Sequence, residues 1–158
     1  MRRNLQAIAK SVEKHLTELT RAKLKPLDDL SRFPKTGGVY VVYDGKSALY
    51  AGIATNLKRR FHQHIEDRRV ASALTVKLAF LEAKIVKVGG RYPKSRQEFF
   101  KDANYLIAYR RAAHKVRRMK ARFIEVNSAP VRIILEAYAG MLLKTKLNDF
   151  NMELEKTL

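Results

Sequence analysis

Cysteine is absent from the 158-residue chain, and proline and glycine are scarce. Without cysteine there is no disulfide, no thiolate zinc ribbon and no cysteine nucleophile. The absence fits a reducing compartment, so we predict a cytoplasmic protein. The 4 prolines and 7 glycines form no linker that would divide the chain. We therefore expect a single domain over residues 1–158.

Long apolar runs and acidic residues are also lacking. No segment approaches the roughly 18 apolar residues of a membrane span, so we expect no membrane association. Only 15 Asp and Glu stand against 33 Lys and Arg, which gives a formal net charge of +18. Such an excess favours a polyanionic partner, because basic groups that neutralise phosphates release counterions.

Hydrophobic periodicity and turn signals predict a mixture of helices and strands. A β-hairpin is indicated by two aromatic and β-branched segments on either side of the turn signal Asp44-Gly45, and Thr55 or Asn56 is a helix cap. The segment over 71–87 is open between helix and extended chain. We predict helices over residues 3–23, 56–67, 95–119 and 128–146, and strands over residues 38–43, 47–53 and 122–126.

Two tyrosines and two glycines lie in the predicted hairpin. Pairing of its strands brings Tyr40 close to the strand that carries Tyr50 and Gly52. A strand tyrosine most often packs in a core. Beside a fixed cation, however, a phenol can accept or relay a proton. Gly38 and Gly52 are candidate positions for close approach of a backbone or a phosphate, although a simple strand-end glycine looks the same.

A basic helix follows the hairpin and carries Lys58, Arg59 and Arg60. A charge run of this kind is most often a solvated face. Successive residues of a helix point about 100° apart, so at most one or two of these side chains reach one site. Arg60 and His64 are four residues apart and share a face, which makes them the candidates, and a guanidinium suits a phosphate that gains charge.

Glu136 stands out as a carboxylate within the apolar run from Val131 to Leu143. The ordinary interpretation is an ion pair with Arg132, one helical turn away. The alternative is a hard divalent ion, Mg²⁺ or Mn²⁺, which one carboxylate can hold while the ion keeps most of its waters. Asn148 follows twelve residues later and would ordinarily be only a helix C-terminal residue.

These residues together resemble the GIY-YIG nuclease family, with Gly38-Val39-Tyr40 in place of GIY and Tyr50-Ala51-Gly52 in place of YIG. The spacings are ten residues from Tyr40 to Tyr50 and ten from Tyr50 to Arg60. The resemblance implies a small α+β fold in which a three-stranded antiparallel sheet is flanked by helices. It also implies DNA hydrolysis with one divalent ion.

The resemblance assigns a role to each matched residue. Tyr40 is implied as general base or proton relay, Tyr50 and Arg60 as holders of the scissile phosphate, Glu136 as the metal ligand and Asn148 as support. Two departures accompany the match. Ile53 stands where several relatives carry a lysine, and the 76 residues from Arg60 to Glu136 are about twice the separation in compact members.

The long separation implies an expanded middle region over about residues 68–120. Its basic residues are interleaved with Tyr105 and Tyr109, which suggests an arm that follows a phosphate backbone, with a solvated basic helix as the alternative. The candidate DNA-binding residues are Lys58, Arg59, Arg110, Arg111, Lys115, Arg117 and Arg118.

The sequence thus predicts a metal-dependent endonuclease acting on DNA, with RNA left open as a substrate. The competing hypothesis is a non-catalytic nucleic-acid-binding module of the same fold, and a third is a basic RNA-associated structural protein. The last explains the charge and leaves the spacings unexplained. The oligomeric state is open, and a dimer is one way to cut both strands.

Overall fold

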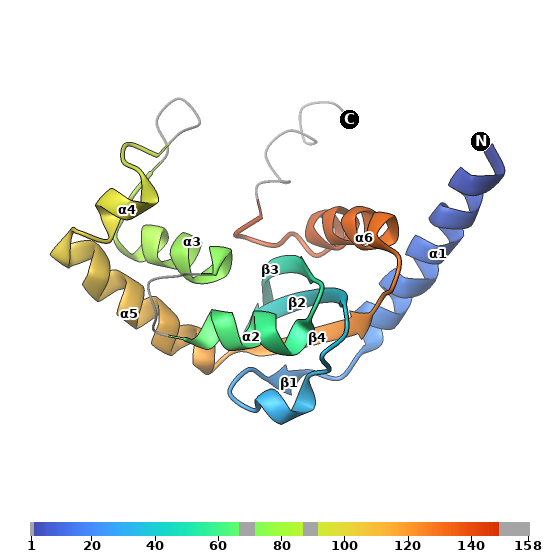
Figure 1. The fold of residues 1–158 in the computed structure, drawn as a ribbon, viewed down its shortest axis with the longest axis horizontal. Coiled ribbons are helices and arrows are strands. Elements are labelled where there is room, and N and C mark those ends of the chain that lie inside the picture. The colour runs from blue at the N-terminus through green and yellow to red at the C-terminus, as the bar shows by residue number, and fades with distance from the viewer. Residues whose placement is uncertain (1, 67–71, 87–91, 149–158) are drawn as a thin grey trace.

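The computed structural model describes residues 2–66, 72–86 and 92–148. A four-stranded antiparallel sheet with strand order β1-β4-β2-β3 lies at its centre, with helices around it (Figure 1). The strands are β1 (Lys25–Pro26), β2 (Gly38–Asp44), β3 (Ser47–Ala54) and β4 (Lys120–Glu125). The helices are α1 (Arg2–Arg21), η1 (Leu30–Arg32), α2 (Leu57–Ile65), α3 (Ala73–Glu82), α4 (Arg96–Phe99), α5 (Ala103–Arg117) and α6 (Ala129–Leu142).

The hairpin formed by β2 and β3 sets the register of the sheet. Asp44 pairs with Ser47, so two residues form the turn, and Gly45 has a φ of 61° there. That backbone conformation favours glycine. Farther along the hairpin an irregularity shifts the register, and Tyr40 therefore lies opposite Gly52. The predicted hairpin is therefore confirmed, and its free edge is β3.

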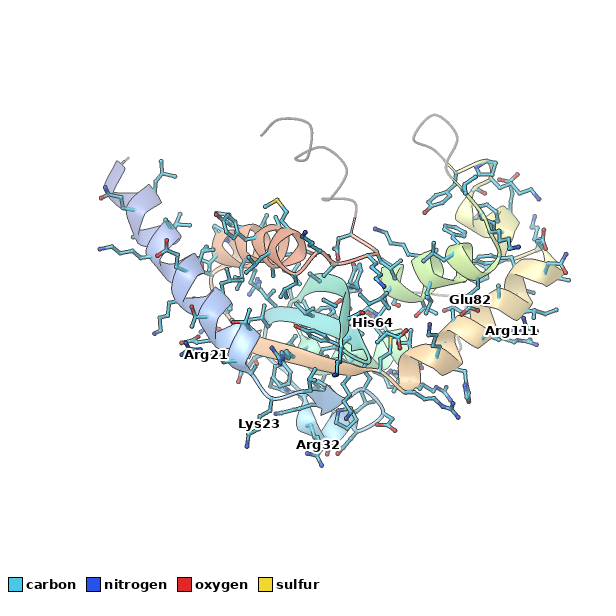
Figure 2. All side chains as sticks on the ribbon, turned by 180° about the vertical axis from the view of Figure 1, so that it is seen from behind. Arg21, Lys23, Arg32, His64, Glu82 and Arg111 are labelled. Carbon is cyan, nitrogen blue, oxygen red and sulfur yellow. The ribbon has the colours of Figure 1, made fainter. Side chains whose placement is uncertain are left out.

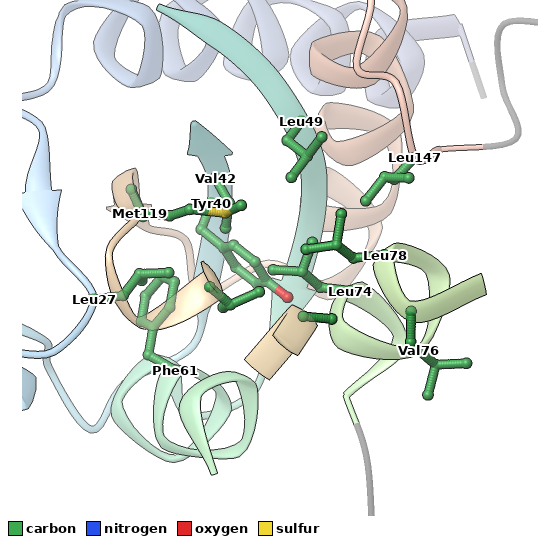
Figure 3. Close-up of a cluster of buried hydrophobic side chains, with 14 of the residues drawn as sticks. Leu27, Tyr40, Val42, Leu49, Phe61, Leu74, Val76, Leu78, Met119 and Leu147 are labelled. Atoms are coloured by element: carbon green, nitrogen blue, oxygen red, sulfur yellow. The ribbon is translucent and has the colours of Figure 1, made fainter. Parts of the chain in front are cut away.

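The two faces of the sheet bury two separate cores. Tyr40 and Val42 point into a core shared with α2, α3 and α5, whereas Val39 and Val41 point into a core shared with α1 and α6. This is the alternation expected of a strand covered on both faces. Figure 3 shows the first core, with Tyr40 and Phe61 close together. In Figure 1, α1 and the α3–α5 group extend from opposite sides of the sheet.

The prediction of a helix-flanked antiparallel sheet is confirmed, but the number of strands was wrong. The sheet has four strands because Lys25 and Pro26 pair with Ala121 and Lys120 of β4. A two-residue strand is too short to show a period of two, and its partner lies almost one hundred residues away. The local sequence pattern therefore carries no signal for β1.

The predicted helices are present with changed boundaries. The segment predicted over 95–119 is divided into α4 and α5, because the Asp102 side chain caps α5 by accepting from the backbone N–H groups of Asn104 and Tyr105. The open segment after residue 71 forms α3. Asp67, Ala71 and Lys87, the predicted ends of two segments, lie outside the described residues. No helix within the described ranges is long and apolar enough to cross a membrane.

Candidate active site at the free edge of the sheet

A hydrogen bond between Tyr40 and His64 lies at the centre of the candidate site. The Tyr40 hydroxyl oxygen is 2.8 Å from His64 Nε2, and each residue is 1% exposed. Their rings are 5.4 Å apart, and the Phe61 ring lies 4.9 Å from that of Tyr40. A phenol and an imidazole, both capable of proton transfer, are therefore held against each other within an aromatic cluster.

Helix α2 delivers His64 to this position. The Asn56 side chain accepts a hydrogen bond from the Arg59 backbone N–H at 2.9 Å, so Asn56 is the cap that starts the helix. Leu57 and Phe61 are fully buried and fix the rotation of α2 against the sheet. His64 follows Phe61 into the core, while Arg60 remains partly exposed on the neighbouring surface.

Burial keeps both members of the pair uncharged. Desolvation is the main cause that lowers the pKa of His64 to about 3, and the positive charge of Arg60 adds to the shift. Desolvation is also the main reason why the pKa of Tyr40 is well above its usual value, and Tyr50 adds to the shift. Neutral imidazole and neutral phenol are therefore the forms present at neutral pH. His64 Nδ1 is buried without a hydrogen-bond partner among the described residues.

The two motif glycines have packing roles. A Cβ atom on Gly52 would lie 2.5 Å from the Tyr40 hydroxyl oxygen and 2.9 Å from a Tyr50 ring carbon. The space above Gly52 is thus occupied by the Tyr40 ring, and Tyr50 lies beside it with ring centroids 6.3 Å apart. A Cβ atom on Gly38 would lie 2.1 Å from the Ile124 carbonyl oxygen, so Gly38 permits the close pairing of β2 with β4.

Glu136 approaches the site from α6, on the other face of the sheet. Burial raises the pKa of its carboxyl group, and the positive charges of Arg60 and Lys77 act in the opposite direction. The negative charge of Glu136 in turn acts on Tyr40. Charged side chains from helices on both faces of the sheet therefore interact: Glu136 of α6 with Arg60 of α2 and Lys77 of α3.

Arg132 does not take up the ion pair that the helical spacing allowed. Its guanidinium donates to the Val126 carbonyl oxygen at 2.8 Å and to the Asn127 carbonyl oxygen at 3.3 Å. Arg132 thereby closes the turn before α6, which begins with the Ser128 cap and Pro130 in its first turn. Glu136 is left facing the Arg60 and Lys77 charges.

Asn148 attaches the segment after α6 to the outer edge of β3 through hydrogen bonds. Its side-chain nitrogen donates to the Ala51 carbonyl oxygen at 2.9 Å, and its side-chain oxygen accepts from the Ala51 N–H at 2.7 Å. The Leu147 N–H donates to the Leu49 carbonyl oxygen at 2.9 Å. Ala51 lies between Tyr50 and Gly52, so Asn148 holds the strand segment that presents both.

The remaining candidate residues lie outside this cluster. Lys58 and Arg59 are on the first turn of α2, and Arg59 is exposed. On α5, Arg117 donates to the Ile65 carbonyl oxygen at 2.7 Å and Lys115 pairs with Asp44 at 2.9 Å. The exposed basic residues of α5 and its C-terminus line a shallow surface of about 450 Å³: Arg110, Arg111, His114, Lys115 and Arg118.

The tyrosines of the middle region are part of the core. Tyr105 is 1% exposed and Tyr109 is 2% exposed, and their rings lie among Phe80, Phe99 and Phe100. They are therefore inaccessible to a nucleic acid, although the sequence interleaves them with arginines. Helical periodicity places them on the face of α5 opposite the exposed arginines.

Lys77 was not among the residues predicted for the site. It comes from α3, in the expanded middle region, and its Nζ donates to the Leu147 carbonyl oxygen at 2.8 Å. The sequence does contain a signal that points to Lys77, because it is the lone cation in the apolar run Ala73–Leu81. The same reasoning had singled out Glu136 in α6.

Residues 36–97 match the GIY-YIG catalytic domain. The resemblance to the GIY-YIG family is confirmed. The matched segment contains Tyr40, Tyr50, Arg60 and His64 and ends before Glu136 and Asn148. The positions of the last two therefore rest on the contacts described above.

Solved structures of low similarity include GIY-YIG domains. The magnesium-bound GIY-YIG N-terminal endonuclease domain of UvrC from Thermotoga maritima is 17% identical, covers 75% of this chain and 90% of its own, and has a TM-score of 0.41. A point mutant of that domain bound to the catalytic divalent cation is 15% identical, with coverages of 75% and 89% and the same TM-score. No curated protein sequence matches the chain.

Proposed function

We propose that this chain is a divalent-metal-dependent endonuclease that hydrolyses phosphodiester bonds of DNA. The observation that carries the proposal is the buried Tyr40–His64 hydrogen bond within electrostatic range of Arg60 and Glu136. Hydrolysis of a phosphodiester needs a path for the proton of water and positive charge for the phosphate. The GIY-YIG match over residues 36–97 supports a nuclease, and the net charge of +18 supports a nucleic-acid substrate.

The proton path uses the neutral forms of both buried groups. In the tautomer with the His64 proton on Nδ1, the Tyr40 hydroxyl donates to Nε2. Tyr40 then accepts a proton from the attacking water while passing its own proton to His64. The free protein disfavours a charged His64, but the negative charge of a bound phosphate raises the proton affinity of the imidazole. A phenolate is never required.

Arg60 and Tyr50 complete the phosphate-binding side of the site. Arg60 is partly exposed, and its Nη1 lies 3.3 Å from the Gln63 side-chain oxygen, which helps to orient the guanidinium. A planar guanidinium donates two parallel hydrogen bonds to a phosphate. Its charge contributes most as the phosphorus gains negative charge, so Arg60 acts on the rate as well as on affinity.

Glu136 fits a single hard cation. Its carboxyl group is partly buried, and this burial raises its pKa because the negative charge loses solvation. Within the described residues no three His, Cys, Asp or Glu side chains are grouped for metal binding, so the fit is to Mg²⁺ or Mn²⁺ that retains most of its waters. Bound at Glu136, the ion would supply positive charge for the phosphate oxygens.

A plasmid assay tests the proposal against a non-catalytic binding module. Supercoiled DNA is incubated with protein plus Mg²⁺, Mn²⁺ or EDTA, and nicked product is measured over time. We expect nicking with either metal, none with EDTA, and at least a hundredfold loss in Glu136→Gln with DNA affinity retained. Glu18→Gln, at an exposed position of α1, is the matched control and should behave as wild type.

Two outcomes would contradict the proposal in different ways. Equal nicking by wild type and Glu136→Gln would remove the metal-binding role of Glu136 and point to a contaminating nuclease. DNA binding without nicking under any metal condition would favour the binding module instead.

A further inference from the structure

A small pocket lies on α3, in the part of the chain that lengthens the separation from Arg60 to Glu136. Its volume is about 160 Å³. That is roughly half the lower limit of about 300 Å³ for sites that enclose drug-sized ligands, so the pocket suits one flat ring system. The lining residues are Ala73, Val76, Lys77, Phe80, Tyr92 and Lys94.

Lys77 connects this pocket with the candidate active site. Its side chain lines the pocket, and its charge acts on Glu136. Its Nζ also donates to the Leu147 carbonyl oxygen, next to Asn148. Lys77 is therefore a common neighbour of the pocket and of the candidate site that holds Glu136.

The pocket combines an aromatic wall with a basic rim. The Tyr92 ring lies 4.2 Å from the Phe80 ring at an interplanar angle of 44°. Phe80 is 6% exposed and is fixed by Phe99 and Tyr105, at 4.9 Å and 5.5 Å. A wall held in this way loses little freedom when a flat ligand packs on it.

The rim is suited to phosphate. Lys94 is about half exposed, and its ion pair with Asp102 is long at 3.9 Å, so its ammonium group can exchange that partner at little cost. Lys77 and Lys94 thus stand on the rim of an aromatic pocket. Proteins hold unpaired nucleotides with this combination, because every base has a face that stacks and every linkage has a charge.

We infer that this pocket binds one unpaired base of the substrate strand beside the scissile phosphate. The substrate is then a DNA with an unpaired nucleotide at the cleavage point, such as a flap, bulge or single strand, in preference to continuous duplex. A base pair is too large for the pocket, whereas an unpaired base enters at lower cost because no base pair has to open. The inference rests on the proposed nuclease function for the position of the scissile phosphate.

Binding assays with catalysis switched off test the inference. Glu136→Gln protein is titrated by fluorescence anisotropy into a labelled duplex and into the same duplex with a short bulge. We expect the bulged DNA to bind at least tenfold more tightly. Adding Tyr92→Ala should reduce affinity for the bulged DNA by about 5- to 150-fold, the range for loss of one stacking contact, and leave duplex affinity within twofold.

Two further variants separate stacking from general damage. Tyr92→Phe retains the ring and should retain the preference, and Lys94→Gln should weaken bulged DNA alone. Tyr138→Ala removes an exposed tyrosine on α6 that is outside the pocket and is the matched control. 2-Aminopurine at successive unpaired positions gives a direct reading, because stacking on the aromatic wall quenches its fluorescence, and Tyr92→Ala should restore the signal.

Either of two results overturns the inference. One is that Glu136→Gln protein binds bulged and continuous duplex DNA with equal affinity, and the other is that Tyr92→Ala reduces affinity for both DNAs equally. Failure of the nuclease proposal looks different, because the anisotropy preference would persist while the plasmid assay showed no nicking. Plasmid nicking without any preference in binding would retain the nuclease and remove the base pocket.

Discussion

Tyr40 and His64 are hydrogen-bonded to each other in a position where each residue is only 1% exposed. This contact joins the first hairpin strand to α2 and has a consequence for folding as well as for chemistry. His64 stays neutral in the folded protein down to a pKa of about 3, whereas the same side chain binds a proton at higher pH in the unfolded chain. The free energy of unfolding therefore depends on pH.

The first prediction is an acid-sensitive stability. The unfolded histidine titrates near 6.5 and folded His64 near 3, so only the unfolded chain binds the proton between these values. The contribution is complete above pH 6.5 and is lost as the pH falls toward 3. We expect His64 to account for roughly 2 kcal/mol of the difference in unfolding free energy between pH 7.5 and pH 5.

Urea unfolding at the two pH values measures this difference. His64→Gln removes the titrating group and should flatten the pH dependence by that amount, whatever its effect on stability at pH 7.5. His114→Gln, at an exposed position of α5, is the matched control for the substitution itself. If His64→Gln retained the wild-type slope, the acid sensitivity would belong to other groups.

The second prediction concerns the phenol of Tyr40. Tyr40→Phe preserves the packing over Gly52 and removes the oxygen that lies against His64 Nε2. We expect single-turnover cleavage at saturating DNA to fall by about 10²–10⁴-fold, with little change in affinity. The matched variant Tyr50→Phe should lose more in affinity relative to rate. A loss below about tenfold in Tyr40→Phe would move the proton-accepting role to His64.

The residues that sequence reasoning placed together were those linked by strong local signals. The Asp44-Gly45 signal identified the hairpin, and His64 follows from a well-capped helix. The exact pairing of Tyr40 with Gly52 depends on a shift in register between Val42 and Tyr43, for which the sequence carries no signal. Glu136 was recognised because a lone carboxylate in an apolar run requires a reason. Local patterns were therefore sufficient for the hairpin, α2 and the carboxylate.

Contacts between distant segments could not be predicted in the same way. Two examples are the pairing of Lys25 with Ala121 and the hydrogen bond from Lys77 to Leu147. In each case the local sequence pattern of one segment carries no information about its partner. The burial of Tyr105 is a third example, since an interleaved charge pattern describes a surface helix and an amphipathic helix equally well. Tertiary packing decided each case.

The third prediction addresses Asn148 as a positioning residue. Asn148→Ala removes both hydrogen bonds to Ala51, and we expect about 1–2 kcal/mol less stability, since each neutral hydrogen bond contributes about 1 kcal/mol. Asn148→Asp keeps the oxygen that accepts from the Ala51 N–H but places its other carboxylate oxygen against the Ala51 carbonyl oxygen, so it should destabilise at least as much. Thermal unfolding and single-turnover rates measure the two effects, with Asn104→Ala as an exposed control.

A purely structural role and a positioning role differ in the rates. If Asn148 aligns Tyr50 and Gly52, the rate of folded Asn148→Ala should fall at saturating DNA, and Asn148→Asp should not restore it. If Asn148→Ala cleaved at the wild-type rate at a temperature where it is fully folded, Asn148 would contribute to stability and not to positioning of the site.

The fourth prediction concerns the exposed basic face of α5, made by Arg110, Arg111 and Arg118. The apolar side of α5 packs on α3 and α2, so these arginines point outward, as Figure 2 shows for Arg111. Arg117 and Lys115 are excluded because they bind the Ile65 carbonyl oxygen and Asp44. If the face follows a DNA backbone, replacing the three arginines with glutamine weakens binding to all sequences alike.

The salt dependence decides between a DNA contact and a solvated face. Each phosphate contact that is lost should reduce the slope of log K against log salt by about 0.9, so the triple variant should flatten it by up to roughly 2.7. The rate at saturating DNA should be unchanged, because the three side chains lie outside the Tyr40–His64 site. The matched control replaces Lys10, Lys14 and Arg21 on α1, which removes the same charge elsewhere. Equal flattening in both variants would indicate net charge alone, and an unchanged slope in the α5 variant would leave these arginines solvated.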